Sequence, residues 1–278
     1  MAARRYSRNE ALFGADGQAK IAATKVVIIG LGGLGSHVAQ QLAYLGVADY
    51  GLIDFDIVTD SSLNRLVGAV DADVGAETKK VAVAERTIKA IKPDATVASV
   101  DGKVADDEAV SAIARSDVVF GCLDRDVHRI ELTETCTAHA KPYVDLATDI
   151  GEGGGELFYG GRVIFCDGTR CLVCLPGVLN QEAIARDRMN PEQRAADRRI
   201  YGIDRDALAG TGPAVVAING VVASLAVTEF MVHVTGLREP APQLTYRGEL
   251  AIVRRSNDAG AEGCYYCSGI WGSSVVPS

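Results

Sequence analysis

The sequence has no excess of basic residues. Its 278 residues contain 28 Lys and Arg against 36 Asp and Glu, which gives a formal net charge of −8. Binding to nucleic acid depends on a basic surface that neutralises phosphates, so the composition disfavours a nucleic-acid partner. Any anionic ligand must then be bound by a local site.

The sequence also lacks an apolar run near its beginning. Three arginines stand within the first nine residues, but no hydrophobic stretch typical of a signal peptide or anchor follows them. The one long apolar stretch, residues 213–234, is interrupted by Asn219 and Glu229, which are costly groups in hydrocarbon. We therefore expect a core or dimer-interface helix, no membrane partner and a cytoplasmic location.

A disulfide framework is not expected from the seven cysteines, because nothing in the sequence indicates secretion. Four of them form two C-x-x-C pairs about 90 residues apart: Cys171 with Cys174, and Cys264 with Cys267. Four thiolates fill the tetrahedron that Zn²⁺ prefers and leave no position for water, so the pattern predicts a structural zinc. Redox-active or coincidental pairs are the alternative. The other three, Cys122, Cys136 and Cys166, are predicted to be small buried hydrophobic residues.

Strand-like and helix-like segments alternate over residues 25–145. The predicted strands are 25–29, 50–54, 96–100, 117–121 and 142–145, and the predicted helices are 36–45, 79–91, 106–114 and 127–140. Such alternation predicts a parallel sheet covered by helices on both faces.

The pattern changes after residue 150. The sequence predicts a hairpin with strands 156–159 and 162–165 around the turn Gly160-Gly161, and a solvated helix and loop over 181–206. Strands at 243–247 and 250–254 follow the apolar helix. The predicted fold class is α/β: a Rossmann-like, doubly wound, mostly parallel sheet with antiparallel C-terminal strands and a zinc-stapled extension.

A glycine-rich loop links the first strand to the first helix. Residues Gly30 to Gly35 fit G-x-G-x-x-G, a pattern that lets phosphate approach backbone N–H groups at the helix N-terminus. Alone it is equally consistent with NAD, FAD or ATP. Asp54 follows about 20 residues later at the end of the second strand, where a carboxylate can meet the ribose hydroxyls.

Two further features favour ATP over a redox dinucleotide. Arg65 lies in a loop that can carry it to a phosphate, and Asp124 ends the fourth strand at the carboxyl edge of the sheet. A carboxylate there can hold magnesium or act on a leaving pyrophosphate, and hydride transfer needs neither. Placing an unpaired charge at the end of a buried strand costs desolvation free energy, so an aspartate there indicates a functional carboxylate.

In this order the residues resemble the ThiF/MoeB family, the adenylating enzymes that activate ubiquitin-like proteins. The similarity runs over nearly the whole chain, through Arg5-Tyr-Ser-Arg8, the glycine loop, Asp54-Phe-Asp56, Leu63-Asn-Arg65, Val74-Gly75, Asp124, both C-x-x-C pairs and the long helix after Gly212-Pro213. The resemblance implies one adenylation domain over 1–278, with a helical arm (1–24), a nucleotide-binding half (25–150) and a half with hairpin, crossover segment, long helix and zinc-binding tail (151–278).

The resemblance also implies an activity. Such enzymes bind ATP and magnesium, and the C-terminal glycine carboxylate of a small ubiquitin-like protein ending in Gly-Gly attacks the α-phosphate. Pyrophosphate leaves and an acyl-adenylate remains, for sulfur transfer or for a bacterial conjugation pathway. The implied ATP-binding residues are Gly32, Gly33, Asp54, Asp56, Asn64, Arg65 and Lys80, with Lys79 as the competing lysine. The implied catalytic residues are Arg65, Asp124, which also binds magnesium, and Arg8, which comes from the other subunit of a homodimer.

Three departures from the family pattern stand out. Ser62 and Arg125 replace common asparagines, which weakens two nucleotide contacts, and no cysteine lies between residues 176 and 213, where members that form a thioester or persulfide carry one. Chemistry beyond the adenylate is therefore left to a downstream sulfur donor or conjugating enzyme. Adenylation of a ribosomal peptide, an NAD-dependent oxidoreductase and a non-catalytic scaffold remain alternatives.

Overall fold

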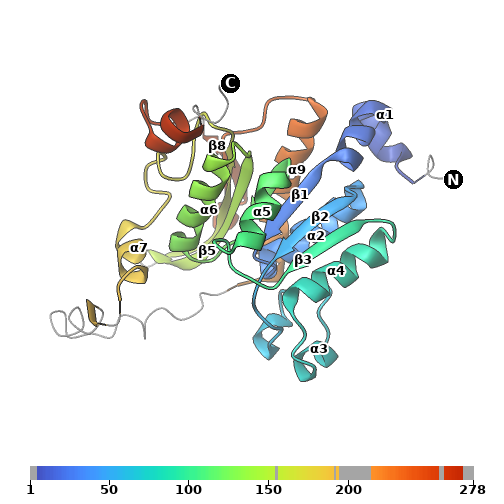
Figure 1. Ribbon diagram of the computed structural model, residues 1–278, viewed down its shortest axis with the longest axis horizontal. Helices are drawn as coiled ribbons and strands as arrows, with labels where there is room; N and C mark the ends of the chain where they lie inside the picture. The colour runs from blue at the N-terminus through green and yellow to red at the C-terminus, as the bar shows by residue number, and fades with distance from the viewer. Residues whose placement is uncertain (1–4, 154–155, 191, 194–213, 257–259, 272–278) are drawn as a thin grey trace.

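One eight-stranded sheet organises the chain, in the order β3-β2-β1-β4-β5-β6-β7-β8 (Figure 1). The computed structural model describes residues 5–153, 156–190, 192–193, 214–256 and 260–271. The strands are β1 (Lys25–Ile29), β2 (Asp49–Ile53), β3 (Thr96–Val100), β4 (Val118–Gly121), β5 (Tyr143–Gly153), β6 (Glu156–Cys166), β7 (Gln243–Arg247) and β8 (Ile252–Ser256). Strands β1 to β5 pair in parallel, and β5 to β8 are antiparallel. The predicted fold class is confirmed.

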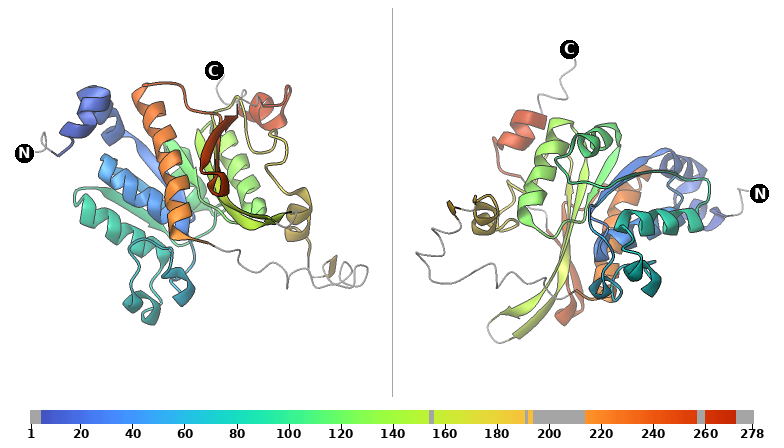
Figure 2. Two further views of the ribbon diagram at one scale, coloured as in Figure 1. Left: turned by 180° about the vertical axis from the view of Figure 1, so that it is seen from behind. Right: turned by 60° about the horizontal axis from the view of Figure 1, so that its bottom comes forward.

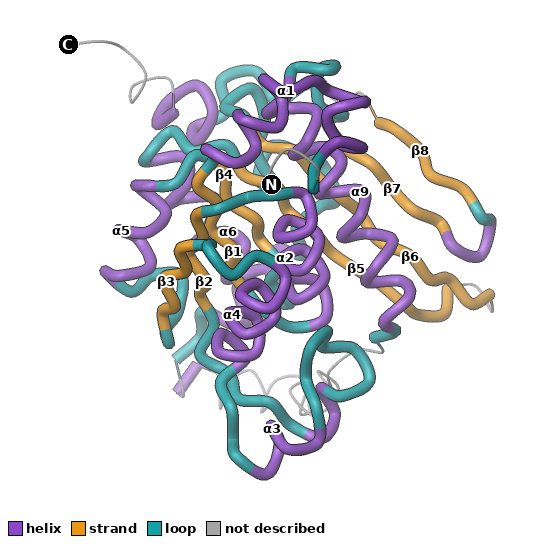
Figure 3. The backbone as a smooth tube through the Cα atoms, turned by 90° about the vertical axis from the view of Figure 1, so that its right-hand side faces the viewer, coloured by secondary structure: helices purple, strands orange, loops and turns teal. Residues whose placement is uncertain are grey.

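Helices cover both faces of the parallel part, as Figures 2 and 3 show. The helices α2 (Gly33–Leu45), α4 (Lys80–Ile91) and α9 (Val216–Thr235) pack on one face, with α1 (Ser7–Ala23) against α9; α5 (Asp107–Arg115) and α6 (Asp126–Ala138) pack on the other. Shorter elements are α3 (Asp71–Gly75), α7 (Gln181–Asp187), the 3₁₀ turns η2 (Asp60–Ser62) and η4 (Gly248–Leu250), and the π-helix η5 (Tyr265–Trp271).

The apolar run in β1 follows from this double cover. Val26 and Ile28 are buried beneath the α2 and α4 layer, whereas Val27 and Ile29 are buried on the α5 side. Successive side chains of a strand point to opposite faces, so a strand covered on both must be apolar throughout. This places β1 at the centre of the molecule and its carboxyl end, with the glycine loop, between two helical layers.

Helix α9 is long and apolar enough to cross a membrane by length and composition, yet it packs as a core helix of this fold. It contacts α1, α2, β5 and β6. Its buried Glu229 accepts hydrogen bonds from both terminal nitrogens of Arg238, at 2.7 and 2.8 Å, and from the backbone N–H of Ala241 at 2.6 Å. The charge in the apolar helix is thus paired within the protein.

The predicted hairpin at 156–165 is wrong, because Gly160 and Gly161 lie inside β6 and do not form a turn. A Cβ on Gly160 would lie 2.0 Å from the carbonyl oxygen of Tyr246, and one on Gly161 would lie 2.3 Å from that of Ala147. Glycine therefore serves the close approach of neighbouring strands at both positions. The hairpin is formed by β5 and β6, which extend together from the sheet (Figure 2, right).

Other boundaries also move. The strand predicted at 142–145 continues to Gly153, because β5 pairs with β6 along its whole length. The strand predicted at 250–254 begins at Ile252, after η4. Of the solvated segment predicted at 181–206, α7 covers the first part, and residues 194–213 lie outside the described residues.

Candidate active site

A cavity of about 470 Å³ lies at the carboxyl ends of β1, β2 and β4. Strand β1 is the point from which the connections run outward in both directions, which is where open α/β sheets bind ligands. Residues near the first turns of three helices line it: Gly33 of α2, Arg129 of α6 and Asn219 of α9. Helix N-termini carry partial positive charge and free N–H groups, so the cavity suits an anionic ligand.

The glycine loop forms one wall of this cavity. Gly30 has a φ of 83°, in the left-handed region that favours glycine. A Cβ on Gly33 would lie 2.2 Å from Nδ2 of Asn219, so a side chain there would displace a neighbour. Gly32 and Gly33, which the sequence analysis assigned to ATP binding, both line the cavity.

Asp54 is held in place by two backbone N–H groups. Its Oδ2 accepts from Leu31 at 2.6 Å and its Oδ1 accepts from Asp56 at 2.8 Å, and the residue is 8% exposed. Burial raises the pKa of this carboxyl, while the two N–H groups and Lys80 act against that shift. The carboxylate is therefore fixed in orientation beside the glycine loop, and Asp54 lines the cavity.

The two candidate lysines separate clearly. Lys80 Nζ lies 2.6 Å from Asp56 Oδ2, and both residues line the cavity. Lys79 Nζ instead lies 3.0 Å from Asp101 and donates to the carbonyl of Phe55 at 2.9 Å. Lys79 is not among the lining residues, so the structure favours Lys80, the predicted choice.

Arg65 reaches the cavity from the loop after η2. Its guanidinium donates to the carbonyl of Ser61 and to Oδ1 of Asn64, the latter at 3.2 Å. Asn64 itself is exposed and does not line the cavity, so its predicted contact is not supported by position. Ser62 is 4% exposed, and its hydroxyl accepts from the N–H of Thr59, which makes it a residue of the turn and not of the cavity.

Asp124 lines the cavity, but the expectation that it ends a buried strand was wrong. Strand β4 ends at Gly121, and Asp124 lies three residues later with an exposed side chain. Its carboxylate costs little desolvation there, and it is accessible to a metal ion. The next residue, Arg125, also lines the cavity and is paired with Asp187 of α7.

Arg8 lies far from this cavity within the same chain. It is exposed on α1, whose Asn9 and Gln18 donate to the carbonyl of Leu45 at the C-terminal end of α2. The cavity lies at the opposite end of that 13-residue helix, about 20 Å away at 1.5 Å per residue. No arginine side chain spans that distance.

Two buried polar residues of the cavity lining were missed at the sequence level. Arg129 is 4% exposed; it is paired with the fully buried Asp145 and donates to the carbonyl of Leu146 at 3.0 Å. Asn219 is 2% exposed, and its Oδ1 accepts from the hydroxyl of Thr148 at 3.3 Å. The signal that could have found Asn219 is a polar residue inside an apolar helix, which is also the feature that disfavours a membrane span.

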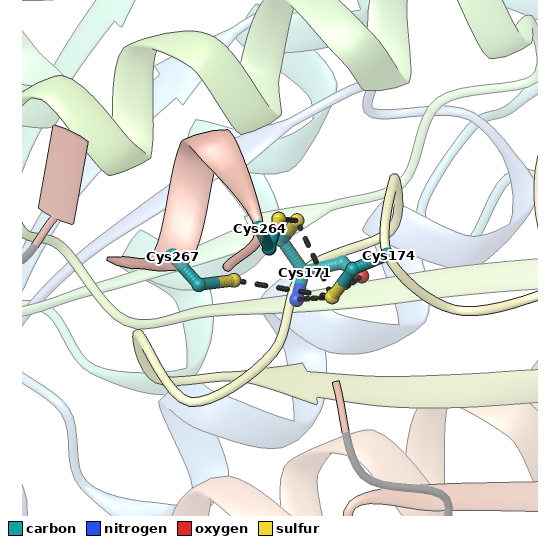
Figure 4. A group of neighbouring side chains, drawn as sticks. All are labelled: Cys171, Cys174, Cys264 and Cys267. Carbon is teal, nitrogen blue, oxygen red and sulfur yellow. Dashed lines mark hydrogen bonds between the residues drawn. The ribbon is translucent and has the colours of Figure 1, made fainter. Parts of the chain in front are cut away.

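The two C-x-x-C pairs come together, as predicted (Figure 4). The four sulfur atoms lie within 4.8 Å of one another, and Cys171 Sγ is 3.8 Å from both Cys174 and Cys264, with Cys174 and Cys267 at 3.9 Å. Four sulfurs on a tetrahedron with Zn–S bonds of about 2.3 Å are about 3.8 Å apart. Hydrogen bonding from Cys267 lowers the pKa of Cys171 to about 5. The donor set and spacing fit a structural zinc.

The remaining cysteines lie outside this cluster. Cys136 and Cys166 are fully buried, and burial raises the pKa of both thiols, which confirms them as small hydrophobic residues. Cys122 is half-buried and contacts the glycine loop. Its thiol pKa is likewise raised by burial.

Comparisons with known proteins agree with the fold. A family model described as the ThiF family matches residues 6–257. The molybdopterin-synthase adenylyltransferase of Escherichia coli is 35% identical over 182 residues, 65% of this chain and 70% of that protein. The sulfur carrier protein ThiS adenylyltransferase of the same organism is 29% identical over 271 residues, 95% of each. The structure of E. coli MccB with ATP superposes with a TM-score of 0.72 at 22% identity, covering 95% of this chain and 74% of that one, a likeness of fold.

Proposed function

The chain belongs to the ThiF family and is an adenylyltransferase, and on that premise we propose that it activates the C-terminal glycine carboxylate of a ubiquitin-like protein ending in Gly-Gly. The observation that carries the proposal is the convergence of Asp54, Arg65, Lys80 and Asp124 around one glycine loop. These residues come from four separate segments. The relative named for the sulfur carrier protein ThiS supports a small protein as substrate.

The proposed reaction is a single displacement at phosphorus. A carboxylate oxygen of the partner forms a bond to the α-phosphorus of ATP, and the bond from that phosphorus to the β-bridging oxygen breaks. The electron pair leaves with pyrophosphate, and the partner retains an acyl-adenylate. Catalysis of such a step depends on positioning and on compensation of charge at the phosphates.

Each wall of the cavity has a role in this proposal. Asp54, fixed by two N–H groups, would accept from the ribose hydroxyls, and Asp56 would hold Lys80 in reach. Lys80 and Arg65 would bind phosphate oxygens, together with the N–H groups at Gly32 and Gly33. Arg65 is already oriented by the carbonyl of its own turn.

Asp124 is the proposed magnesium ligand. Its exposed carboxylate lies at the cavity rim, and oxygen atoms of this kind are what Mg²⁺ prefers. Magnesium would supply neutralisation of the charge that accumulates on the leaving pyrophosphate. The four cysteines are proposed to hold zinc in a structural role, since sulfur would fill every position.

A homodimer would explain Arg8. The same chain cannot bring Arg8 to its own cavity across the length of α2, so the proposed contact comes from a second copy. Arg8 would then add a positive charge to the partner copy's phosphate site.

We further propose a path for the partner's tail to the cavity. A second cavity of about 240 Å³ lies on the antiparallel strands, and Asp149 lines both. Strands β6 and β7 line this second cavity, and an extended tail bound there could continue past Asp149 towards the first cavity. Because no cysteine lies at 176–213, the adenylate would pass to a separate sulfur donor or conjugating enzyme.

Exchange of labelled pyrophosphate into ATP tests the proposal. With magnesium and a cognate protein ending in Gly-Gly, the wild type should exchange label, and truncation of the last glycine of the partner should stop it. Asp124→Ala should lower the rate by about 100-fold or more, while Asp71→Asn, an exposed carboxylate on α3, should not change it. Absence of partner-dependent exchange would refute the proposed substrate. Exchange that depends on a short peptide instead would favour the ribosomal-peptide alternative.

Mixed dimers test the origin of Arg8. Asp124→Ala and Arg8→Ala chains are each expected to be inactive, yet random mixing should restore about a quarter of the wild-type rate, because half of the dimers then contain one intact cavity. If Arg8 acted within its own chain, mixing would restore nothing.

A further inference from the structure

Asn219 is a buried polar residue in an otherwise apolar helix. It lies one turn into α9 and is 2% exposed, with apolar neighbours along the helix. Burying an amide without hydrogen-bond partners costs stability, so each of its polar atoms requires a partner.

Only one end of this amide is satisfied by the described chain. The hydroxyl of Thr148 on β5 donates to Oδ1 at 3.3 Å, which turns Nδ2 the other way. The described residues supply no acceptor to Nδ2, and this atom is not among their buried polar atoms that lack a partner, so it is open to the cavity. It faces the glycine loop, 2.2 Å from where a Cβ on Gly33 would lie, and Asn219, Thr148 and Gly33 all line the cavity.

The surroundings of Nδ2 select the kind of acceptor. It lies where the N-terminal turns of α2 and α9 meet, and both present positive partial charge. Arg65 is on the same side, with its Cδ 3.5 Å from the Cβ position of Gly33. A donor in such a place suits an anionic oxygen, and phosphate oxygens are the anionic acceptors that glycine loops bind.

We propose that Asn219 donates from Nδ2 to a non-bridging phosphate oxygen of the bound nucleotide, and that Thr148 holds the amide in that orientation. The proposal rests on the proposed binding of ATP and adds a residue that touches the substrate. It also gives Gly33 a second function: besides exposing N–H groups, it leaves the space in which Nδ2 lies. Thr148 is a positioning residue in this arrangement.

The test compares two ligands, with and without phosphate. Dissociation constants of MgATP, measured by calorimetry, and of adenosine, measured by ligand-observed NMR, are determined for the wild type, Asn219→Ala and Asn219→Asp. A hydrogen bond to a charged group is worth about 10-fold or more in affinity. Asn219→Ala should weaken MgATP by about 10-fold, and Asn219→Asp should weaken it more, because a carboxylate repels phosphate. Adenosine binding should change by less than about twofold.

The control is Asn190→Asp, which makes the same change in charge on an exposed residue. Its Oδ1 accepts from the N–H of Gln193 at 2.8 Å, and an aspartate oxygen keeps that bond. Thr148→Val should weaken MgATP by an intermediate factor through Asn219, and it should have no further effect once Asn219 is Ala. Adenosine binding and the unfolding temperature report whether each variant is folded.

Gly33→Ala completes the experiment. With Asn219 present, the new methyl group of Gly33→Ala must displace Nδ2. With Asn219→Ala this conflict is gone, so Gly33→Ala should then lower MgATP affinity by a smaller factor. Equal loss of adenosine and MgATP affinity, or unchanged MgATP affinity in Asn219→Asp, would overturn the proposal. These binding measurements need no protein partner. A failure of partner-dependent exchange would therefore refute the proposed substrate and leave the role of Asn219 at the phosphates unaffected.

Discussion

Removal of the zinc proposed for the four-cysteine cluster should destabilise the protein strongly. A metal bound by the cluster would join Cys174 to Cys264 and so close about 90 residues of chain. A cross-link over a loop of this length constrains the unfolded chain by about 4–5 kcal/mol. η5 also contacts α6 directly, for example through the hydrogen bond from the Tyr266 hydroxyl to Glu134 at 3.0 Å, and these contacts do not depend on the metal. We therefore expect Cys264→Ser to lower the free energy of unfolding by about 4 kcal/mol.

The change should be visible in a thermal scan. At roughly 2–4 °C per kcal/mol for a chain of this size, the unfolding temperature should fall by about 10 °C or more. Zinc content, measured by a colorimetric chelator after thiol modification, should fall from near one per chain to near zero. Prolonged chelation of the wild type should have the same two effects.

Cys122→Ser is the matched control, since it removes a thiol outside the cluster. Zinc content should stay unchanged in this variant, and the fall in unfolding temperature should be much smaller. A metal-free protein that unfolds at the wild-type temperature would contradict the reasoning, because the loop closure would then contribute nothing.

Two other predictions concern charged side chains. Lys80→Ala should lower the rate of pyrophosphate exchange by about 10- to 100-fold through loss of a phosphate contact. Lys79→Ala should leave this rate within about twofold of the wild type, because Lys80 lines the cavity and Lys79 does not. Equal effects of the two variants on the exchange rate would show that the lysine is misassigned. Arg86 lowers the pKa of Asp73 in the folded state to about 2, below its unfolded value of about 3.9. The stability that this contact adds is therefore present above pH 4 and lost as the pH falls towards 2. Urea midpoints of the wild type and Asp73→Asn should differ at pH 5 and converge at pH 2; a constant gap would contradict the assignment.

The parallel half of the fold was predictable because its signals are local. A continuous apolar run such as Lys25–Ile29 predicts a strand covered on both faces, and a glycine loop directly after it predicts where the strand ends. The antiparallel half was harder. Gly160 and Gly161 were interpreted as a turn because glycine pairs are typical of turns, but their role depends on how closely β7 and β5 approach β6, which no local pattern encodes.

In the candidate site, too, the residues with local sequence signals were predictable and the others were not. Residues on recognisable motifs, such as Asp54 and Arg65, were found from the sequence, since each follows a strand or a turn at a characteristic spacing. Arg129 and Asn219 carry no such spacing, and only packing brings them to the cavity. Asp124 was found for a partly wrong reason, because the sequence could not reveal that the chain leaves β4 at Gly121 and exposes the carboxylate.

Helix α6 lies between the cavity and the four-cysteine cluster. Its N-terminal turn carries Arg129, which lines the cavity, and its C-terminal half carries Glu134, which accepts from Tyr266 of η5. The π-helix η5 packs along α6 and supplies Cys267 to the cluster. Because the cluster contains sulfur at all four positions, it can act on the cavity only by fixing this helix and not through chemistry of its own. A zinc bound by the cysteine cluster would thus help to hold one wall of the cavity in place.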